Sequence, residues 1–275
     1  MSLTLSDQHD SGFTLIELLV ALGIFLLITG AAFTLLGTSQ QRYQTESQVL
    51  TSFQEARLGL DQMVRDVNDA GYPPPTFFSA TSPLQSTSSP FGWSPGYPGL
   101  NRCEIGTAGG GTCLTPGDFD VIIETNPNPQ DATSQVQWIR YSLSGTTLMR
   151  GVVNKAVSHD PYMDTNVAGV LVPFVQNVVN NVCPPQIPNC QTAYPGIFPG
   201  GVPVPIFNYS CETPSLPVYP LPTCASLGPG VDNSPVNIRD VTITLIVAAP
   251  LPDAATGMPR LVQLSGRGRR VNPNH

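Results

Sequence analysis

Two residue types are missing from the first part of this sequence, and their absence divides the 275-residue chain into two regions. No proline occurs before Pro73, and no cysteine occurs before Cys103. Because proline interrupts helices, the proline-free first region is compatible with one long continuous helix. The later region holds all 29 prolines and all six cysteines, so we expect it to be rich in loops and turns.

Charge is also scarce. Charged residues make up 11% of the chain, the formal net charge is −7, and Lys155 is the single lysine. Soluble domains have about 25% charged residues, and binding to nucleic-acid phosphates requires clustered cations. We therefore expect no nucleic-acid partner. One short basic run, Arg267-Gly268-Arg269-Arg270, lies near the C-terminus, and it is interpreted as a solvated tail.

Motifs typical of catalysis are missing as well. The sequence has three histidines, His9, His159 and His275, and no G-x-S-x-G sequence that would mark a nucleophile. A Ser-His-Asp arrangement around His159 stays open as an alternative. The run Gly109-Gly110-Gly111 lacks the Lys-Ser/Thr that completes a phosphate-binding loop, so it is interpreted as a turn. The sequence predicts neither an enzyme nor a bound cofactor.

No clear metal site is encoded either. The C-x₂-C spacing typical of zinc sites is absent. Two aspartate pairs, Asp118 with Asp120 and Asp160 with Asp164, supply oxygen ligands of the kind that calcium prefers, but neither fits the EF-hand spacing. Both pairs are therefore expected on loop surfaces, without a metal.

The N-terminal region contains a long apolar run. Residues 13–36 have a single ionisable side chain, Glu17, and about 20 apolar residues suffice for a helix to cross a bilayer. A secretory signal peptide would have a basic start, a shorter apolar run and a small-residue cleavage site, whereas residues 1–12 contain no lysine or arginine. A simple anchor does not explain Glu17, because a carboxylate inside a membrane span is costly and usually signals a function.

The segment Gly12-Phe13-Thr14-Leu15-Ile16-Glu17-Leu18-Leu19-Val20-Ala21-Leu22 resembles the prepilin signature of type IV pilins and type II secretion pseudopilins. The resemblance implies that a prepilin peptidase cuts after Gly12 and that Phe13 is then N-methylated. It also implies that Glu17 pairs with the N-terminal amine of a neighbouring subunit during assembly. The implied partners are other pilin or minor pilin subunits, the peptidase and the inner membrane.

The leader departs from the family pattern. It carries Asp7, His9 and Asp10 where the family has a basic residue before the glycine, so the distribution of positive charge does not orient the span. Arg42, just past the span, opposes the expected orientation. The later cysteines favour an oxidising compartment, and we therefore place residues 72–275 outside the cytoplasm. A different start codon would also account for the leader. The implied localisation is a single-pass inner-membrane protein, and then a periplasmic or extracellular pilus.

The helix is expected to extend beyond the membrane, from Phe13 to about Ala70. Residues 38–70 contain no proline and one glycine. Gly71 is the expected C-terminal cap, and Pro73-Pro74-Pro75 prevents continuation. Six apolar residues spaced four and three apart predict a seam that docks this half of the helix on a globular domain: Val49, Phe53, Ala56, Leu60, Met63 and Val67.

Alternating apolar residues in the later region predict an antiparallel β-sheet packed on the helix. The expected class is α+β: a long N-terminal helix, transmembrane in its first half, on a sheet domain with long disulfide-stapled loops, as in the pilin fold. The interval Val167–Val182 is compatible with a short helix followed by a strand. The predicted strands are Phe119–Thr125, a hairpin of Val136–Leu143 and Thr146–Val153 turning at Ser144-Gly145, Val241–Val247 and Leu261–Leu264.

An even number of cysteines in an exported domain predicts disulfides. Sequence proximity favours three pairs, although the last four cysteines could exchange partners: Cys103–Cys113, Cys183–Cys190 and Cys211–Cys224. Residues 183–235 hold 13 of the 29 prolines and are expected to form a loop-rich insertion. The expected organisation is a leader (1–12), a membrane or filament-core helix (13–37), its amphipathic continuation (38–71) and an extracytoplasmic domain (72–275).

Further segments between Phe53 and Tyr72 resemble PilW-type minor pilins, and segments from Trp138 onward resemble both PilW-type minor pilins and the related J-type pseudopilins. The resemblance implies a minor subunit of a type IV pilus that takes part in assembly or priming. A J-type pseudopilin of type II secretion is the first alternative. A membrane-anchored adhesin, sugar-binding protein or hydrolase is the second. The segments are Phe53–Arg57, Asp61–Asp66, Ala70–Tyr72, Trp138–Tyr141, Leu148–Arg150 and Ile238–Leu245.

Overall fold

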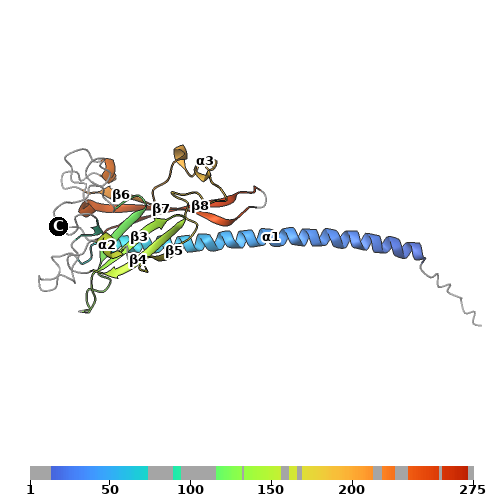
Figure 1. The fold of residues 1–275 in the computed structure, drawn as a ribbon, viewed down its shortest axis with the longest axis horizontal. Coiled ribbons are helices and arrows are strands. Elements are labelled where there is room, and N and C mark those ends of the chain that lie inside the picture. The colour runs from blue at the N-terminus through green and yellow to red at the C-terminus, as the bar shows by residue number, and fades with distance from the viewer. Residues whose placement is uncertain are drawn as a thin grey trace, which may run out of the picture. The chain divides into compact units, whose positions relative to one another are not determined.

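The structure is a computed structural model. It describes residues 14–73, 89–93, 116–131, 133–155, 161–165, 169–212, 219–226, 235–253 and 256–271. The chain divides into two compact units, Met1–Ser47 and Gln48–His275. One helix, α1, is continuous across this boundary and spans Leu15–Asn68 (Figure 1).

Helix α1 begins and ends within two residues of the predicted limits. Gly71 follows its end with a φ of +77°, a conformation that glycine adopts without steric cost. The N–H of Gly71 donates to the carbonyl oxygen of Glu124 at 2.8 Å. The predicted glycine therefore ends the helix and also joins the chain to the sheet.

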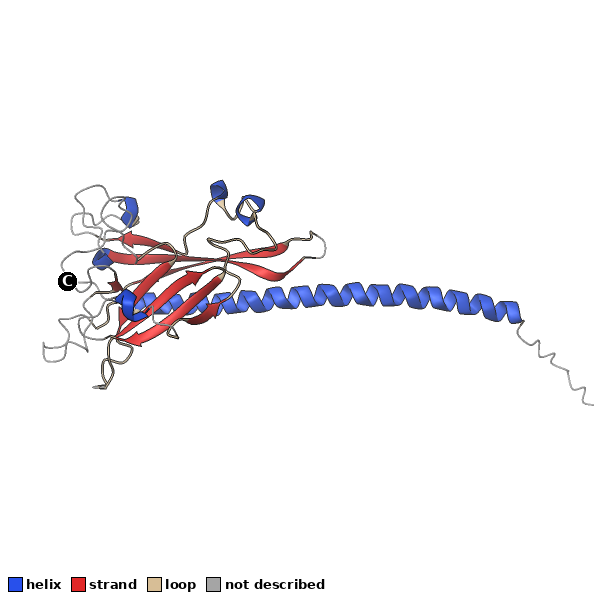
Figure 2. Ribbon diagram, viewed as in Figure 1, coloured by secondary structure: helices blue, strands red, loops and turns tan. Residues whose placement is uncertain are grey.

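The described residues of the second unit form two antiparallel sheets (Figure 2). The first has five strands in chain order: β1 (Phe91–Gly92), β2 (Asp120–Thr125), β3 (Gln137–Ser144), β4 (Thr147–Asn154) and β5 (Val172–Val175). The second has three: β6 (Phe207–Cys211), β7 (Ile238–Pro252) and β8 (Pro259–Arg269). The short helical segments are α2 (Pro161–Thr165), α3 (Cys190–Ala193), η1 (Pro199–Gly201), η2 (Cys224–Ser226) and η3 (Pro235–Asn237).

The predicted α+β class is confirmed, and so is the central hairpin. Strands β3 and β4 pair up to Ser144 and Thr147, and Gly145 turns the chain with a φ of +58°. The expectation of one sheet is wrong, because the strands divide between two. Alternation along a strand shows which side chains share a face. It does not show which other strands that strand pairs with.

Two parts of the three-stranded sheet were not expected. Strand β6 lies inside the segment predicted as loop, although Phe207 and Tyr209 alternate with the exposed Asn208. The basic run is not a solvated tail, because β8 continues through it and pairs with β7 as far as Arg269. Arg267 and Arg269 both face the buried carboxylate of Asp240 on β7.

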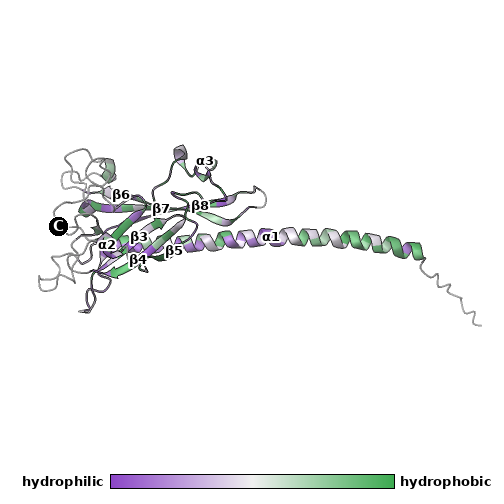
Figure 3. Cartoon of the chain, viewed as in Figure 1, coloured by the Kyte–Doolittle hydropathy of each residue, from purple (hydrophilic) through white to green (hydrophobic). Residues whose placement is uncertain are grey.

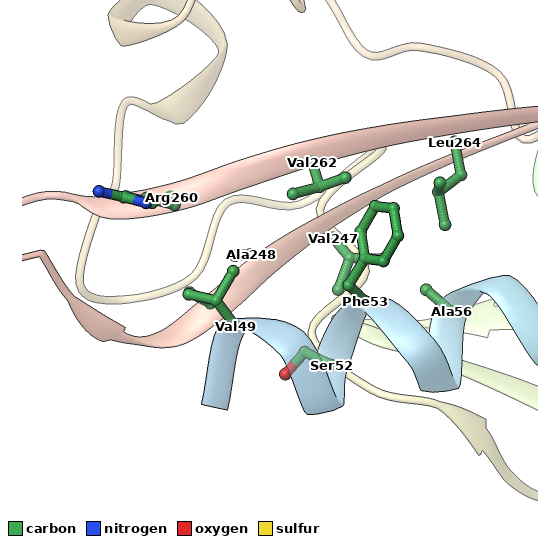
Figure 4. Close-up of a pocket in the computed structure, with 10 residues that line it drawn as sticks. Val49, Ser52, Phe53, Ala56, Val247, Ala248, Arg260, Val262 and Leu264 are labelled. Atoms are coloured by element: carbon green, nitrogen blue, oxygen red, sulfur yellow. The ribbon is translucent and has the colours of Figure 1, made fainter. Parts of the chain in front are cut away.

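The seam of α1 docks on the globular part of the chain, as predicted, and it contacts both sheets. Ala56, Leu60, Met63 and Val67 are buried in one hydrophobic core with residues of the two sheets. The first two seam residues are only half-buried. These two residues, Val49 and Phe53, line a small apolar pocket (Figure 4). The opposite walls come from β7 and β8 and include Val247, Val262 and Leu264.

Two glycines of β8 let the helix approach the sheet closely. A Cβ built on Gly268 would lie 2.6 Å from Cβ of Val67, and one on Gly266 would lie 3.0 Å from Cγ2 of Val64. Beside them, the N–H of Arg269 donates to Oδ1 of Asn68 at 2.8 Å. The last two turns of α1 therefore rest directly on the backbone of β8.

Two of the three favoured disulfides are present among the described residues. Cys183 bonds to Cys190 and Cys211 bonds to Cys224. The first links the start of the insertion to α3, and the second links the end of β6 to η2. The third predicted pair, Cys103 with Cys113, lies outside the described residues.

We expect Gly268→Ala to lower the free energy of unfolding by about 1–3 kcal/mol, because the added methyl group must displace Val67 or separate α1 from β8. Chemical denaturation of the detergent-solubilised chain, followed by near-UV circular dichroism, measures the change. Gly196→Ala is the control, since nothing lies within 4 Å of its added Cβ. Equal stability of the two variants would contradict the close packing.

Candidate functional site

The first part of α1 is mostly coloured as hydrophobic in Figure 3, and its large apolar side chains are exposed. Large apolar side chains between Leu15 and Leu36 are 53–79% exposed. The helix is long and apolar enough to cross a membrane, and no residue of its most apolar stretch is buried. The hydroxyls of Thr29 and Thr34 donate to the carbonyl oxygens of Phe25 and Gly30, so they need no water. This surface requires lipid or protein as its surroundings.

The one carboxylate of this surface is bound by the first residue that the structure describes. Both the N–H and the hydroxyl of Thr14 donate to Oε2 of Glu17, at 3.0 and 2.8 Å. In return, the N–H of Glu17 lies 3.4 Å from Oγ1 of Thr14. This reciprocal arrangement is a capping box, which satisfies donors left free at the start of a helix.

The capping box gives Glu17 a local role that sequence reasoning missed. The spacing Thr14-Leu15-Ile16-Glu17 is the S/T-x-x-E pattern of such caps, so the signal was present in the sequence. A carboxylate near a helix N-terminus is also favoured by the positive end of the helix dipole. Gly12 and Phe13 lie outside the described residues, so cleavage and methylation there stay predictions.

A second polar cluster fixes the other end of α1 to the first sheet. Oδ2 of the buried Asp66 accepts hydrogen bonds from the hydroxyl of Tyr141 at 2.5 Å and from Nη2 of Arg150 at 3.1 Å. Nε of Arg150 donates to the Tyr141 oxygen at 2.9 Å. Gln62, one turn earlier on α1, donates to Oδ1 of Asp66 at 2.8 Å.

The charges and hydrogen bonds of this cluster favour a stable attachment of α1 to the first sheet. Burial, and then the charge of Asp66, raises the pKa of Tyr141 well above its ordinary value. The phenol therefore keeps its proton at neutral pH and donates a hydrogen bond to the Asp66 carboxylate. A buried carboxylate is stable only when it is paired and hydrogen-bonded, and Asp66 meets both conditions only while α1 is docked.

One of the candidate calcium ligands, Asp120, lies in a different environment from the loop surface that the sequence suggested. Asp120 lies in β2 rather than on a loop surface, and it pairs with Arg140 through Nε at 3.0 Å and through Nη2. Ser142 also donates to Asp120. Burial raises the pKa of Asp120, while Arg140 opposes the shift. A carboxylate committed to an arginine is a poor ligand for a cation.

The remaining candidates form no cluster. Asp118 lies just before β2, and burial raises its pKa. Asp164 lies in α2, while Asp160 and His159 fall outside the described residues. Over the described ranges, no three His, Cys, Asp or Glu side chains gather closely enough to hold a metal ion.

Comparison with known proteins adds one match. Residues 7–33 match the model of the prokaryotic N-terminal methylation motif. This range includes Gly12, Phe13, Thr14 and Glu17. No curated protein and no solved structure matches the chain.

We expect Tyr141→Phe to lower the free energy of unfolding by about 1–3 kcal/mol, because it removes a donor from the buried Asp66 carboxylate. Thermal or chemical denaturation of the detergent-solubilised chain measures the loss. Tyr43→Phe, at an exposed position of α1, serves as the control and should change stability by less than about 0.5 kcal/mol. Matching losses in both variants would exclude a stabilising role for the cluster.

Proposed function

We propose that this type IV pilin-like protein, a class supported by its N-terminal methylation motif, is a minor subunit of a type IV pilus. It is first held in the inner membrane by residues 13–37 and later transferred to a filament. The observation that carries the proposal is the matched motif on the exposed apolar first part of α1, where Glu17 is the single carboxylate between residues 15 and 36. Its role is structural rather than catalytic.

Processing would precede assembly. Prepilin peptidase would cleave after Gly12, and the new amine at Phe13 would be N-methylated. The mature chain would then begin at Phe13, one residue before Thr14, while the Glu17 carboxylate lies in the first turn of α1. In a filament, the amine of one subunit pairs with Glu17 of the next. The apolar surface exchanges lipid for neighbouring helices at little cost, because both surroundings are apolar.

Glu17 would set the register between neighbouring helices in the filament. Before assembly the carboxylate has Thr14 as its local donor. A neighbour's amine adds an opposite charge in an apolar environment, where such attraction is strong. An apolar helix surface alone fixes neither the rotation nor the translation of its neighbours, whereas a buried ion pair specifies both.

The second unit would be displayed on the outside of the filament, at or near its tip, where it takes part in priming assembly. The two disulfides among its described residues suit an oxidising compartment. A J-type pseudopilin of type II secretion is the alternative, since the motif is common to both systems. A neighbouring operon for an outer-membrane secretion pore would favour the pseudopilin. An adhesin or sugar-binding role of the loop-rich domain is compatible with a filament subunit.

Mass spectrometry of the mature N-terminus tests the processing step. In cells that contain prepilin peptidase, we expect the chain to begin at Phe13 and to carry one added methyl group. Without the peptidase, residues 1–12 should remain. An intact leader in both strains would overturn the proposed class.

Glu17→Ala should leave membrane insertion intact and lower incorporation into filaments by about tenfold or more, because the ion pair that sets the register is lost. Immunoblots of sheared filaments and of the membrane fraction measure the two quantities. Glu46→Ala removes an exposed carboxylate from the same helix and should assemble normally. Normal incorporation of the Glu17 variant would count against the register role.

A further inference from the structure

Two arginines and one glutamate lie side by side at one end of the three-stranded sheet. Arg239 is in β7, Arg270 directly follows β8 and Glu212 directly follows β6. Backbone hydrogen bonds hold them in place: Arg270 N–H donates to Arg239 O, and Glu212 N–H donates to Asn237 O, both at 2.9 Å. Each of the three strands, or the residue directly after it, thus places one charged side chain at this end of the sheet.

The two arginines are cross-strand neighbours. Asp240 pairs with Arg269 in the ladder, so Arg239 and Arg270 face each other one step further along. Like charges directly opposite each other destabilise a sheet. Elsewhere in the described chain the same sheet places Arg267 and Arg269 against the carboxylate of Asp240. Arg239 and Arg270 likewise share one carboxylate, that of Glu212, which unlike Asp240 is partly exposed.

The hydrogen bonds of these two guanidinium groups are incomplete. Nε and Nη1 of Arg239 and Nε of Arg270 are buried and have no hydrogen-bond acceptor. Arg270 is 4% exposed, and its Nη1 donates to the carbonyl oxygen of Val236 at 3.0 Å. Glu212 approaches Nε of Arg239 only to 3.4 Å. Buried donors without acceptors are rare in native proteins and call for an explanation.

The local charge favours an anionic ligand. Two cations share one carboxylate, so the cluster has a formal charge of +1. Burial, and then repulsion by Arg239, lowers the pKa of Arg270 to about 10, while Glu212 opposes the shift. Arg270 therefore remains charged at neutral pH. A guanidinium group presents a planar fork of donors that matches two oxygens of a carboxylate or phosphate.

We propose that Arg239 and Arg270 form a binding site for an oxyanion group, a phosphate or a carboxylate. The ligand approaches from the side where the side chains of Arg239 and Glu212 keep 16% and 35% of their surface exposed. Its negative charge offsets the repulsion between the two arginines. The site is independent of the apolar half of α1 and of the proposed filament role.

Isothermal titration calorimetry of the full-length chain in detergent, with inorganic phosphate or acetate at constant ionic strength, tests the site. We expect saturable binding of at least one of the two anions. Phosphate binding alone would define a site for a tetrahedral anion, and acetate binding would extend it to carboxylates. No saturable binding of either would overturn the proposal.

Arg239→Gln should weaken anion binding by about tenfold or more, because it removes a charged donor. Arg267→Gln is the matched control: it removes the same charge from an arginine that faces Asp240, and it should leave the affinity unchanged. Equal affinities of the two variants would refute the site. Near-UV circular dichroism verifies folding.

Glu212→Gln gives an independent readout, and it decides the question if Arg239→Gln does not fold. Loss of the competing carboxylate should tighten anion binding several-fold, because the ligand then faces two unopposed cations. Unchanged or weaker binding in a folded Glu212→Gln variant would contradict the assignment.

Discussion

The rest of the structure depends on one constraint, the unbroken backbone hydrogen bonding of α1 through two different environments. From Leu15 to Leu36 the helix presents apolar side chains on its surface, whereas from Ala56 to Val67 it buries a narrow seam against two sheets. An α-helix satisfies its own backbone polar groups wherever it lies. One element can therefore pass from an apolar medium to a protein core without exposing unpaired donors or acceptors.

Docking of the second half of α1 combines close packing with a buried polar contact. The glycines of β8 remove the side chains that would separate helix from sheet. On the other side, Asp66 finds its partners on β3 and β4 of the first sheet. Apolar packing alone tolerates small rotations of a helix. The Asp66 carboxylate is satisfied in one orientation, so it selects the face of α1 that is buried.

Several of the few charged side chains in this chain are buried as ion pairs. Glu124 is fully buried and pairs with Lys155, the single lysine. Asp120 pairs with Arg140, and Asp240 with two arginines of β8. Removal of charge from water is tolerated when the opposite charge lies close by. The incomplete hydrogen bonding of Arg239 and Arg270 is the observation behind the proposed anion site.

Much of the fold could be predicted from local pattern. The extent of α1, the seam residues, the glycine at its end and the β3–β4 hairpin all follow from spacing and turn chemistry, which depend on neighbours in the sequence. Glu17 and the prepilin-like segment were also visible there. The role of Thr14 in capping Glu17 was encoded in the same local spacing and was overlooked.

The division into two sheets, the place of β6 and the use of the basic run depended on contacts between residues far apart in the chain. Arg267 looked like part of a solvated tail because its partner, Asp240, lies 27 residues away. Asp66 and Tyr141 are 75 residues apart, and no local periodicity connects them. The sequence by itself determined the helix, its apolar half and its single carboxylate. Tertiary structure decided which polar groups meet, because pairing across strands and helices depends on three-dimensional proximity.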